Sequence, residues 1–225
     1  GQEQKSQWLQ IRRDRPDYVL MWGWGVMNQV AIQEAANIRF PMENFIGVWW
    51  SGSENDVLPA GAKANGYKAI TFHNVGSNFP VFDDIQKYVV ATGKAAGAGD
   101  NIGTALYNRG MYNAMLLSEA AKTAQAITGK SAISQADMIK GMEALEMTEE
   151  KMAALGLPNF GPSFSVNCQN HGGDGLVAVA QWDAGAGSWS IVSDYQNSDM
   201  GVLQPLIDAD SSAFASENNI TPNCN

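Results

Sequence analysis

Continuous apolar runs alternate with helix-like segments in the first third of the chain. Three runs have the length and composition of buried strands: residues 18–22, 45–50 and 67–72. Between the first two runs, apolar residues recur with helical spacing from Val30 to Ile38, Asn28 can cap this helix, and Pro41 ends it. The second connection, residues 51–65, is expected to be a loop with a short helix. This order predicts an α/β fold, in which flanking helices cover a parallel sheet with right-handed crossovers.

Beyond Pro80 the pattern becomes mainly helical. Four helices are predicted, separated by glycine-rich breaks at residues 93–99 and at Gly129; they cover residues 81–90, 101–127, 134–145 and 148–155. Ser134 with Asp137, and Thr148 with Lys151, are placed to cap two of them. The chain then returns to strands, at residues 164–168, 176–182 and 188–192, before a final helix over residues 203–214.

Composition and charge exclude several classes of protein. With 225 residues, of which 45% are hydrophobic, the chain can bury a core and is expected to be globular. The net charge of −9 and the scattered basic residues argue against a nucleic-acid partner. The longest apolar stretch, residues 18–30, is shorter than the roughly 20 residues that span a bilayer. Residues 1–13 contain no apolar segment of a signal peptide, so we expect such a peptide to have been removed or never attached.

The two cysteines, Cys168 and Cys224, are expected to form a disulfide that holds the end of the chain. It would close a loop of about 57 residues and stabilise the fold by about 4 kcal/mol. Such a bond would indicate an oxidising compartment. Two free thiols in a cytosolic protein are the alternative, which the spacing leaves open. A zinc site is not favoured, because His171 lies near Cys168 but no CxxC motif or second histidine completes the ligand set.

Sequence motifs give no support for catalysis or for a cofactor. The segment Gly23-Trp-Gly-Val-Met-Asn28 follows a strand as a dinucleotide-binding turn does, but Asn28 replaces the third glycine. Bulky Trp24 would also obstruct a pyrophosphate. His73 and His171 have no serine or cysteine nearby in sequence, so structural roles are expected for both. We therefore expect no catalytic residues, no metal site and no cofactor.

Tryptophans mark the ends of the first two predicted strands. Trp22 and Trp24 end the first, and Trp49 and Trp50 end the second. Ligands of open parallel sheets bind beyond the carboxyl edge, so these rings could form an apolar wall for a flat or branched solute. Trp22 and Trp49 have the parity of the buried faces and are expected in the core, whereas Trp24 and Trp50 are expected to line the cleft.

The ordered motifs Asp17-Tyr-Val-Leu-Met-Trp-Gly-Trp-Gly, Gln33-Glu-Ala-Ala and Phe45-Ile-Gly-Val-Trp-Trp-Ser-Gly, followed by Tyr107-Asn-Arg-Gly-Met-Tyr-Asn-Ala-Met115, carry a family resemblance. The chain resembles the C-terminal half of the branched-chain amino acid receptors, the type I periplasmic substrate-binding proteins of ABC transporters. The resemblance implies two α/β lobes joined by three crossovers, a small-molecule solute held between them, a periplasmic location and delivery to membrane permease subunits. It also implies a division of the chain: residues 1–75 in the second lobe, 76–160 in a helical return into the first, and 161–225 in a crossover back and a tail.

The same resemblance suggests which residues contact the solute. Trp24 matches a position where relatives place an aromatic ring, and Trp50 stands where amino-acid binders carry an acid that pairs the ammonium group. An ammonium group buried without a counter-charge is costly, so amino-acid binding would require Glu54 to supply the negative charge. An aromatic or hydrophobic carboxylate needs no such charge and is the ligand class that we expect. Tyr107 and Arg109 are expected to approach from the other lobe, with Arg109 holding a carboxylate. A helix-surface position for Arg109 is the alternative.

Ser51, beside Trp50, completes the expected ligand-binding set. Transport-coupled solute capture without chemistry is the function that the resemblance implies. Two other functions remain as alternatives: a sensory receptor domain of the same fold, and an enzyme of the doubly wound α/β class. A fused signalling segment would distinguish the first, and turnover of a solute the second.

Overall fold

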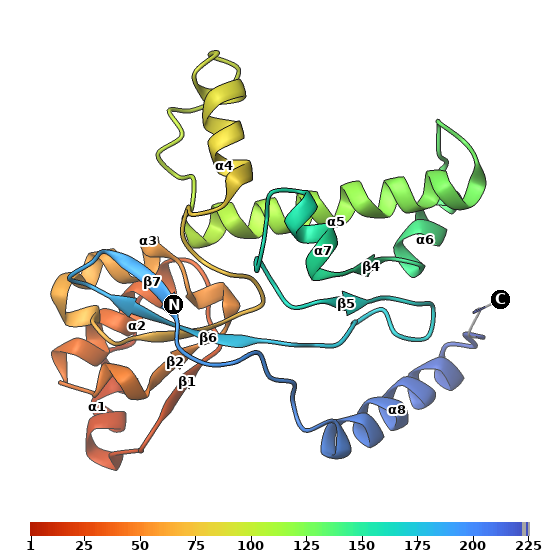
Figure 1. Cartoon of the computed structure of the whole chain (residues 1–225). Coiled ribbons are helices and arrows are strands. Elements are labelled where there is room, and N and C mark those ends of the chain that lie inside the picture. The colour runs from red at the N-terminus through yellow and green to blue at the C-terminus, as the bar shows by residue number, and fades with distance from the viewer. Residues whose placement is uncertain (222–223, 225) are drawn as a thin grey trace. The chain divides into compact units, whose positions relative to one another are not determined.

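A computed structural model describes residues 1–221 and residue 224 (Figure 1). The chain forms two compact units. Unit 1 comprises Gly1–Met115, Thr148–Pro162 and Val177–Tyr195. Unit 2 comprises Leu116–Met147, Ser163–Leu176 and Gln196–Asn225. The predicted division of the chain between two lobes stays a prediction.

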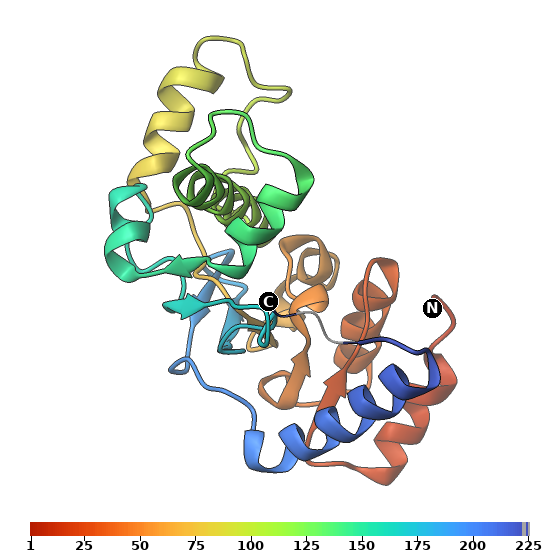
Figure 2. The same ribbon diagram turned by 90° about the vertical axis from the view of Figure 1, so that its right-hand side faces the viewer.

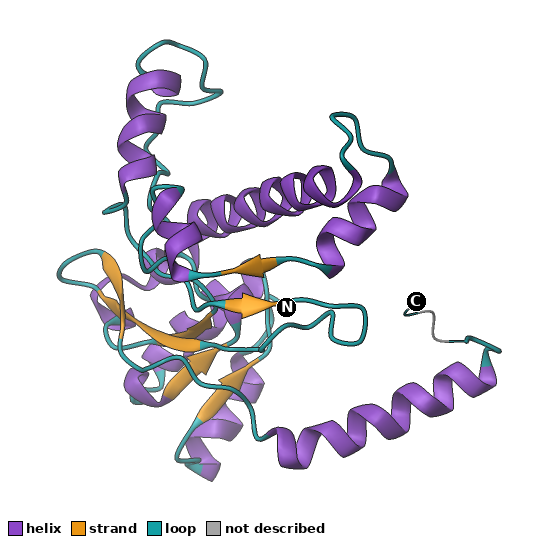
Figure 3. Cartoon of the chain, turned by 45° about the vertical axis from the view of Figure 1, so that its right-hand side comes forward, coloured by secondary structure: helices purple, strands orange, loops and turns teal. Residues whose placement is uncertain are grey.

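A five-stranded mixed sheet forms the centre of unit 1 (Figure 3). Its spatial order is β1-β2-β3-β6-β7, with bounds Val19–Met21, Phe45–Gly47, Lys68–Thr71, Ala178–Asp183 and Ser188–Ile191. The first three strands are parallel, as predicted. Strand β6 pairs antiparallel with β3, with Ile70 opposite Val179, and β7 pairs antiparallel with β6. The predicted α/β fold with a parallel sheet is thus confirmed, and two antiparallel strands extend it.

Short helices connect and cover these strands. The α-helices that lie wholly in unit 1 are α1 (Lys5–Asp14), α2 (Val26–Asn37), α3 (Glu54–Val57), α4 (Pro80–Ile85) and α7 (Glu149–Ala154). Single-turn or irregular helices are η1 (Met42–Asn44), η2 (Trp49–Ser51), η3 (Leu58–Ala64) and η4 (Gln86–Val90). The long helix α5 (Ala105–Thr128) begins in unit 1 and ends in unit 2.

Aromatic rings fill the core between the sheet and its helices. Trp8 of α1 meets Phe45 at 5.2 Å between ring centroids, and Phe45 meets Tyr67 at 5.1 Å. Tyr67 in turn contacts Trp189, which contacts Trp182 at 5.4 Å. Ala31, Ile32 and Ala35 of α2 belong to the same buried cluster. Its members are Trp8, Ala31, Ile32, Ala35, Met42, Phe45, Val57, Ala64, Tyr67, Ala69, Ala180, Trp182 and Trp189. The row of rings therefore ties the parallel and antiparallel parts of the sheet into one core.

The first two strands are shorter than predicted. Strand β2 ends at Gly47 because the tryptophan segment that follows turns into η2, where the Ser51 N–H donates to the Val48 carbonyl at 2.8 Å. A Cβ on Gly47 would collide with the Tyr67 hydroxyl and lie 2.6 Å from the Ser51 Cβ, so only glycine allows this close turn. Helix α2 begins at Val26, earlier than predicted, and Gly25 with φ of 60° takes the N-cap position that we assigned to Asn28.

Unit 2 is built around the second half of α5. Helix α6 (Gln135–Glu143) begins with the predicted capping box of Ser134 and Asp137. Strands β4 (Glu146–Met147) and β5 (Phe164–Ser165) form a small antiparallel pair, of which β4 was not predicted. The predicted disulfide between Cys168 and Cys224 is confirmed.

The last helix, α8 (Met200–Glu217), is one continuous helix (Figure 2). It contains Pro205, and none of its residues is buried. Within the described part of the chain, no helix combines the length and the apolar character that crossing a bilayer requires.

Candidate functional site

A buried polar network joins the segments that follow β1 and β2. The Asn28 amide nitrogen donates to the Trp50 carbonyl at 2.9 Å and to the Asp56 carboxylate at 3.1 Å. The Ser51 hydroxyl donates to the Gly23 carbonyl at 2.7 Å. Asn28 and Ser51 are fully buried, and each lies on an element that starts beyond the carboxyl edge of the sheet. The network therefore fixes the backbone from which Trp24 and Trp50 project.

Asp56 is the charged member of this network. One of its carboxylate oxygens accepts from the Ser53 N–H at 2.9 Å and from the Ser53 hydroxyl at 2.8 Å, as part of the capping box that begins α3. Burial raises the pKa of Asp56, while its hydrogen bonds with Ser53 and Asn28 and the charge of Arg109 lower it. The hydrogen bonds replace the water that this carboxylate loses.

Three of the four tryptophans at the sheet edge are exposed. Trp24 is 65% exposed and Trp50 is 52% exposed, consistent with rings that line a binding surface. The prediction that Trp22 lies in the core is wrong: it is 72% exposed and meets half-buried Trp49 edge-on at 5.8 Å. The reason is that β1 ends at Met21, so the strand parity on which the prediction rested does not reach Trp22.

Arg109, in the first part of α5, is only 8% exposed, so it is not a helix-surface residue. Its guanidinium carbon lies 5.7 Å from the centroid of the Trp50 ring and 5.4 Å from that of Phe72. Burial lowers the pKa of Arg109, and the charge of Asp56 partly offsets this effect. Two of its nitrogens, Nε and Nη1, are buried without a hydrogen-bond acceptor among the described residues. A buried cation with open donors is suited to bind an anion.

Glu54 faces the start of α5 rather than open solvent. Both of its carboxylate oxygens accept the Ala105 N–H, at 3.2 and 3.1 Å. A carboxylate at this position satisfies a free N–H of the first helical turn and interacts with the positive end of the helix dipole. Burial is the main cause that raises the pKa of Glu54. The carboxylate that could pair a ligand ammonium is thus already engaged.

Tyr107 and Glu54 lie together at a pocket of about 500 Å³, which is lined by Glu54, Asn55, Leu58, Asn101, Thr104, Leu106 and Tyr107. Trp24, Trp50 and Arg109 do not line it. The structure therefore groups the predicted residues in two pairs, Trp50 with Arg109 and Glu54 with Tyr107. Ser51 is a buried support of the backbone, and Trp24 stands apart at the end of the first strand segment.

Two buried polar residues beside Arg109 were not predicted to belong to the site. His73 is fully buried, with Nδ1 2.9 Å from the Asn74 carbonyl and no partner for Nε2 within the described residues. Burial lowers the pKa of His73 to about 4. The Asn108 amide nitrogen donates to the Gly76 carbonyl at 2.9 Å. Its buried Oδ1 accepts no hydrogen bond from any residue that the structure describes. Both residues follow apolar segments in the sequence, which is only a weak signal for a site residue.

Comparisons with known proteins agree with this architecture. A family model described as periplasmic binding protein matches residues 1–187. A crystal structure titled as an ABC transporter permease from the Pseudomonas fluorescens group is 36% identical, with a TM-score of 0.89, and the match covers 100% of this chain and 54% of that one. No curated protein sequence matches the chain.

More distant structures share the fold. A branched-chain amino acid ABC transporter protein from Thermus thermophilus with bound valine is 15% identical, with a TM-score of 0.68, over 88% of this chain and 50% of that one. A solute-binding protein of an ABC transporter from R. palustris, in complex with benzoate, is 15% identical, with a TM-score of 0.56, over 88% and 49%. The chain spans about half the length of these structures. The resemblance predicted from the sequence is confirmed, and the chain belongs to the periplasmic binding protein family.

Proposed function

We propose that this chain is the C-terminal part of the extracytoplasmic solute-binding component of an ABC importer and that its solute is a hydrophobic or aromatic carboxylate. The proposal rests on the surroundings of Arg109. Its buried Nε and Nη1 have no acceptor among the described residues, and its guanidinium lies against the Trp50 ring. The solute is bound in a cleft between two lobes and released unchanged to the permease, so the mechanism is lobe closure without bond making or breaking.

A carboxylate is the group that best complements Arg109. Leaving charged donors buried and unpaired costs several kcal/mol, and a carboxylate accepts two parallel N–H bonds from a guanidinium. Asp56 interacts with Arg109 only through its charge, and its own oxygens are hydrogen-bonded to Ser53 and Asn28. The solute carboxylate would therefore supply the acceptors that the protein does not.

The aromatic surroundings favour a solute with an apolar body. Trp50 and Phe72 both present their rings to Arg109, and Trp50 is half exposed, so part of its side chain is accessible to a ligand. The Glu54 carboxylate, which could pair the ammonium of an amino acid, is bound to the Ala105 N–H. A benzoate-like acid needs no such pairing. Among relatives of this fold, one structure contains valine and another benzoate, so both classes of solute deserve a direct comparison.

The proposed location is the periplasm, where the receptor would meet the permease. The disulfide between Cys168 and Cys224 supports an oxidising compartment. In this proposal residues 1–75 belong to the second lobe, 76–160 return to the first, and 161–225 cross back and form the tail. Neither a nucleic acid nor a cofactor takes part, and the protein is not an enzyme.

Calorimetry with the complete receptor that contains this chain tests the proposal. We expect benzoate or phenylacetate to bind more tightly than leucine or valine, and mass spectrometry to recover the solute unchanged. Arg109→Gln should weaken carboxylate binding by about 2 kcal/mol or more, since a charge-assisted bidentate contact is lost. Arg13→Gln, which removes an exposed arginine of α1, is the matched control and should bind as the wild type does.

Equal or tighter binding of leucine would contradict the proposed class of solute. Unchanged benzoate affinity in Arg109→Gln would contradict the role of Arg109.

A further inference from the structure

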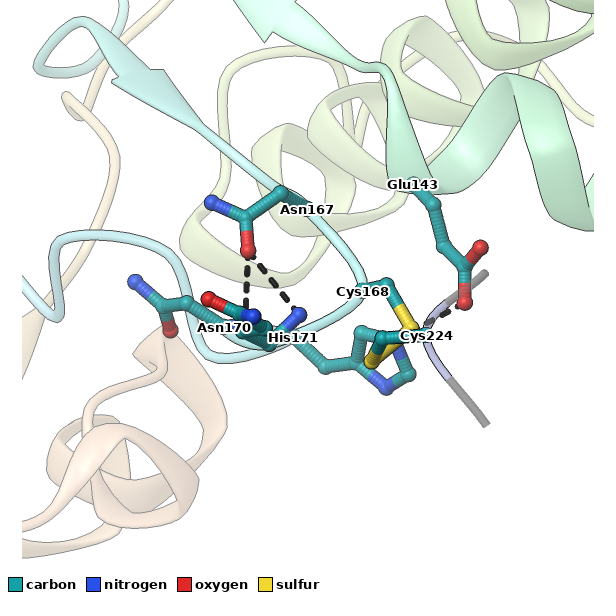
Figure 4. The surroundings of a disulfide bond; sticks show 7 residues. Glu143, Asn167, Cys168, Asn170, His171 and Cys224 are labelled. Carbon is teal, nitrogen blue, oxygen red and sulfur yellow. Dashed lines mark hydrogen bonds and ion pairs between the residues drawn. A yellow bond between two sulfur atoms is a disulfide. The ribbon is translucent and has the colours of Figure 1, made fainter. Parts of the chain in front are cut away.

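Glu143, Cys168 and His171 lie together in unit 2, and a disulfide brings Cys224 to the same place (Figure 4). Glu143 ends α6, Cys168 and His171 lie on the loop after β5, and Cys224 is joined to Cys168 by the disulfide. One ligand atom each from Glu143, Cys168 and His171 lies within 4.8 Å of the others. This group lies outside the site around Arg109 and has no part in the proposed function.

The loop that carries two of these residues is held by its own hydrogen bonds. The Asn167 side-chain oxygen accepts the N–H groups of Gln169 and Asn170, each at 2.9 Å. The Asn170 amide donates to the Gly173 carbonyl at 2.9 Å. Cys168 and His171 are therefore kept on the same turn of the loop, as Figure 4 shows.

A second contact fixes this loop relative to α6. The Val166 N–H donates to the Leu145 carbonyl at 2.9 Å, beside the pair of β4 and β5. His171 Nε2 consequently lies 3.2 Å from a Glu143 carboxylate oxygen. Two ligands of one tetrahedral zinc ion, with bonds of about 2.0–2.2 Å, are separated by about 3.3–3.5 Å. The imidazole and the carboxylate already have nearly this separation.

The two sulfurs become ligands only when the disulfide is reduced. A dithiol reductant supplies two electrons and two protons: the S–S bond breaks, Cys168 and Cys224 become thiols, and the reductant becomes a disulfide. Zinc then displaces the two thiol protons and binds both thiolates, together with the His171 imidazole and the Glu143 carboxylate. Cys224 is exposed and Cys168 is half-buried, so a reductant can reach the bond.

We propose that Glu143, Cys168, His171 and Cys224 form a zinc site when the disulfide is reduced, so that zinc replaces the disulfide as the link that holds the C-terminal segment. The four ligands match a tetrahedral ion of mixed sulfur, nitrogen and oxygen coordination. In the oxidised protein the disulfide holds the same two chain segments together. The C-terminal segment is thereby fixed in both redox states.

Zinc binding to the oxidised and to the phosphine-reduced 225-residue chain is the first measurement, with a chromogenic chelator as competitor. The reduced protein should bind one zinc ion at least about 100-fold more tightly than the oxidised protein, because thiolates dominate zinc affinity. Cobalt added to the reduced protein should produce the thiolate charge-transfer band and the visible bands of tetrahedral coordination. Equal zinc affinity in the two redox states would overturn the proposal.

Variants separate a four-ligand site from simple binding by two thiols. Reduced His171→Ala and Glu143→Gln should each lose about 10-fold or more in zinc affinity, because each removes one direct ligand. Glu150→Gln, an exposed glutamate at the start of α7, is the matched control and should keep the wild-type affinity. If His171→Ala and Glu143→Gln both bind as the wild type does, the ion is held by the thiols alone and the proposed site is wrong.

A readout that does not depend on affinity is the rate of alkylation by iodoacetamide. Zinc should slow the modification of both Cys168 and Cys224 in the reduced protein, and it should slow it less in His171→Ala. Circular dichroism of each variant checks that the fold is retained. Equal alkylation rates with and without zinc would also overturn the proposal.

Discussion

Asn28 and Asp56 are joined by a buried hydrogen bond of 3.1 Å, although 28 residues separate them in the sequence. The same Asn28 amide reaches the Trp50 carbonyl, so one side chain connects α2, η2 and α3. Because Asn28 is fully buried, none of these bonds can be replaced by solvent without opening the structure. This contact sets the position of Trp50, and Trp50 in turn lies over Arg109.

Replacing Asn28 should therefore affect both stability and the site. Asn28→Ala leaves the Trp50 carbonyl and the buried Asp56 carboxylate short of a donor, and we expect the free energy of unfolding to fall by about 2–3 kcal/mol. Asn37→Ala, in the same helix but exposed, should change it by less than about 0.5 kcal/mol. Urea denaturation monitored by tryptophan fluorescence measures both. Equal stability of the two variants would show that the network contributes little.

The buried histidine predicts a dependence of stability on pH. The pKa of His73 is lowered from 6.5 to about 4, mainly by burial, with the charge of Arg109 acting in the same direction and the Asn74 carbonyl opposing it. Between these values the unfolded chain binds more protons than the folded chain. The stability that neutral His73 provides is complete above about pH 6.5 and should decrease by up to about 3 kcal/mol as the pH falls toward 4.

His73→Phe removes this titration while keeping a ring against Phe160. We expect its free energy of unfolding to depend less on pH between about 4 and 6.5 than that of the wild type. Asn37→Ala, which changes an exposed side chain that does not titrate, is the control and should keep the wild-type slope. Chemical denaturation at several pH values gives the slopes, and parallel curves for wild type and His73→Phe would refute the assignment.

Glu54 should stabilise the start of α5 mainly as a hydrogen-bond acceptor, because the cost of burying its charge exceeds the gain from the helix dipole. Burial raises the pKa of Glu54, so the ionised form is disfavoured in the folded protein, and its stabilising contribution decreases as the pH rises through that pKa. Glu54→Gln keeps an acceptor for the Ala105 N–H without the charge, and it should be more stable than the wild type at pH 7. Glu54→Ala lacks the acceptor and should be less stable than Glu54→Gln by about 1 kcal/mol.

Hydrogen exchange of the Ala105 amide tests this assignment directly. The amide should exchange fastest in Glu54→Ala and at similar rates in the wild type and Glu54→Gln. Glu34→Ala, in α2, is the control for loss of a glutamate that does not contact α5. Equal exchange in all four proteins would mean that Glu54 does not cap α5.

Local patterns in the sequence predicted most elements of the fold but not their ends. The strand at residues 45–50 was predicted from its apolar composition, yet β2 ends at Gly47, where the chain turns into η2 and Tyr67, 20 positions later, leaves no room for a side chain. Capping of α6 by Ser134 was predictable because the bond spans only three residues. The end of an element can be predicted from residue types when the contact that fixes it is local in sequence. It cannot be predicted in this way when the partner is distant in sequence.

The same distinction applies to the sites. Trp24 and Trp50 were predicted to line the cleft from their place after strands; both are exposed, and their contact with a solute stays a prediction. The capping of α5 by Glu54 depends on a partner 51 residues away and could not be inferred. For the zinc ligands, the sequence shows only Cys168 and His171 close together, whereas Glu143 joins them through the fold. A site whose side chains come from several distant segments leaves no recognisable motif in a single sequence.

Two helical glycines give a matched test of packing. A Cβ on Gly141 of α6 would lie 2.7 Å from the Ala124 Cβ and would collide with the Ala120 carbonyl of α5. A Cβ on Gly110, also in α5, would have no atom within 4 Å. Gly141→Ala should lower the free energy of unfolding by about 1–3 kcal/mol through overpacking, whereas Gly110→Ala should raise it by about 0.5–1 kcal/mol. Because both variants add the same methyl group to a helix, their different urea midpoints would report the close approach of α5 and α6. Stabilisation by both would mean that the two helices are not in contact at Gly141.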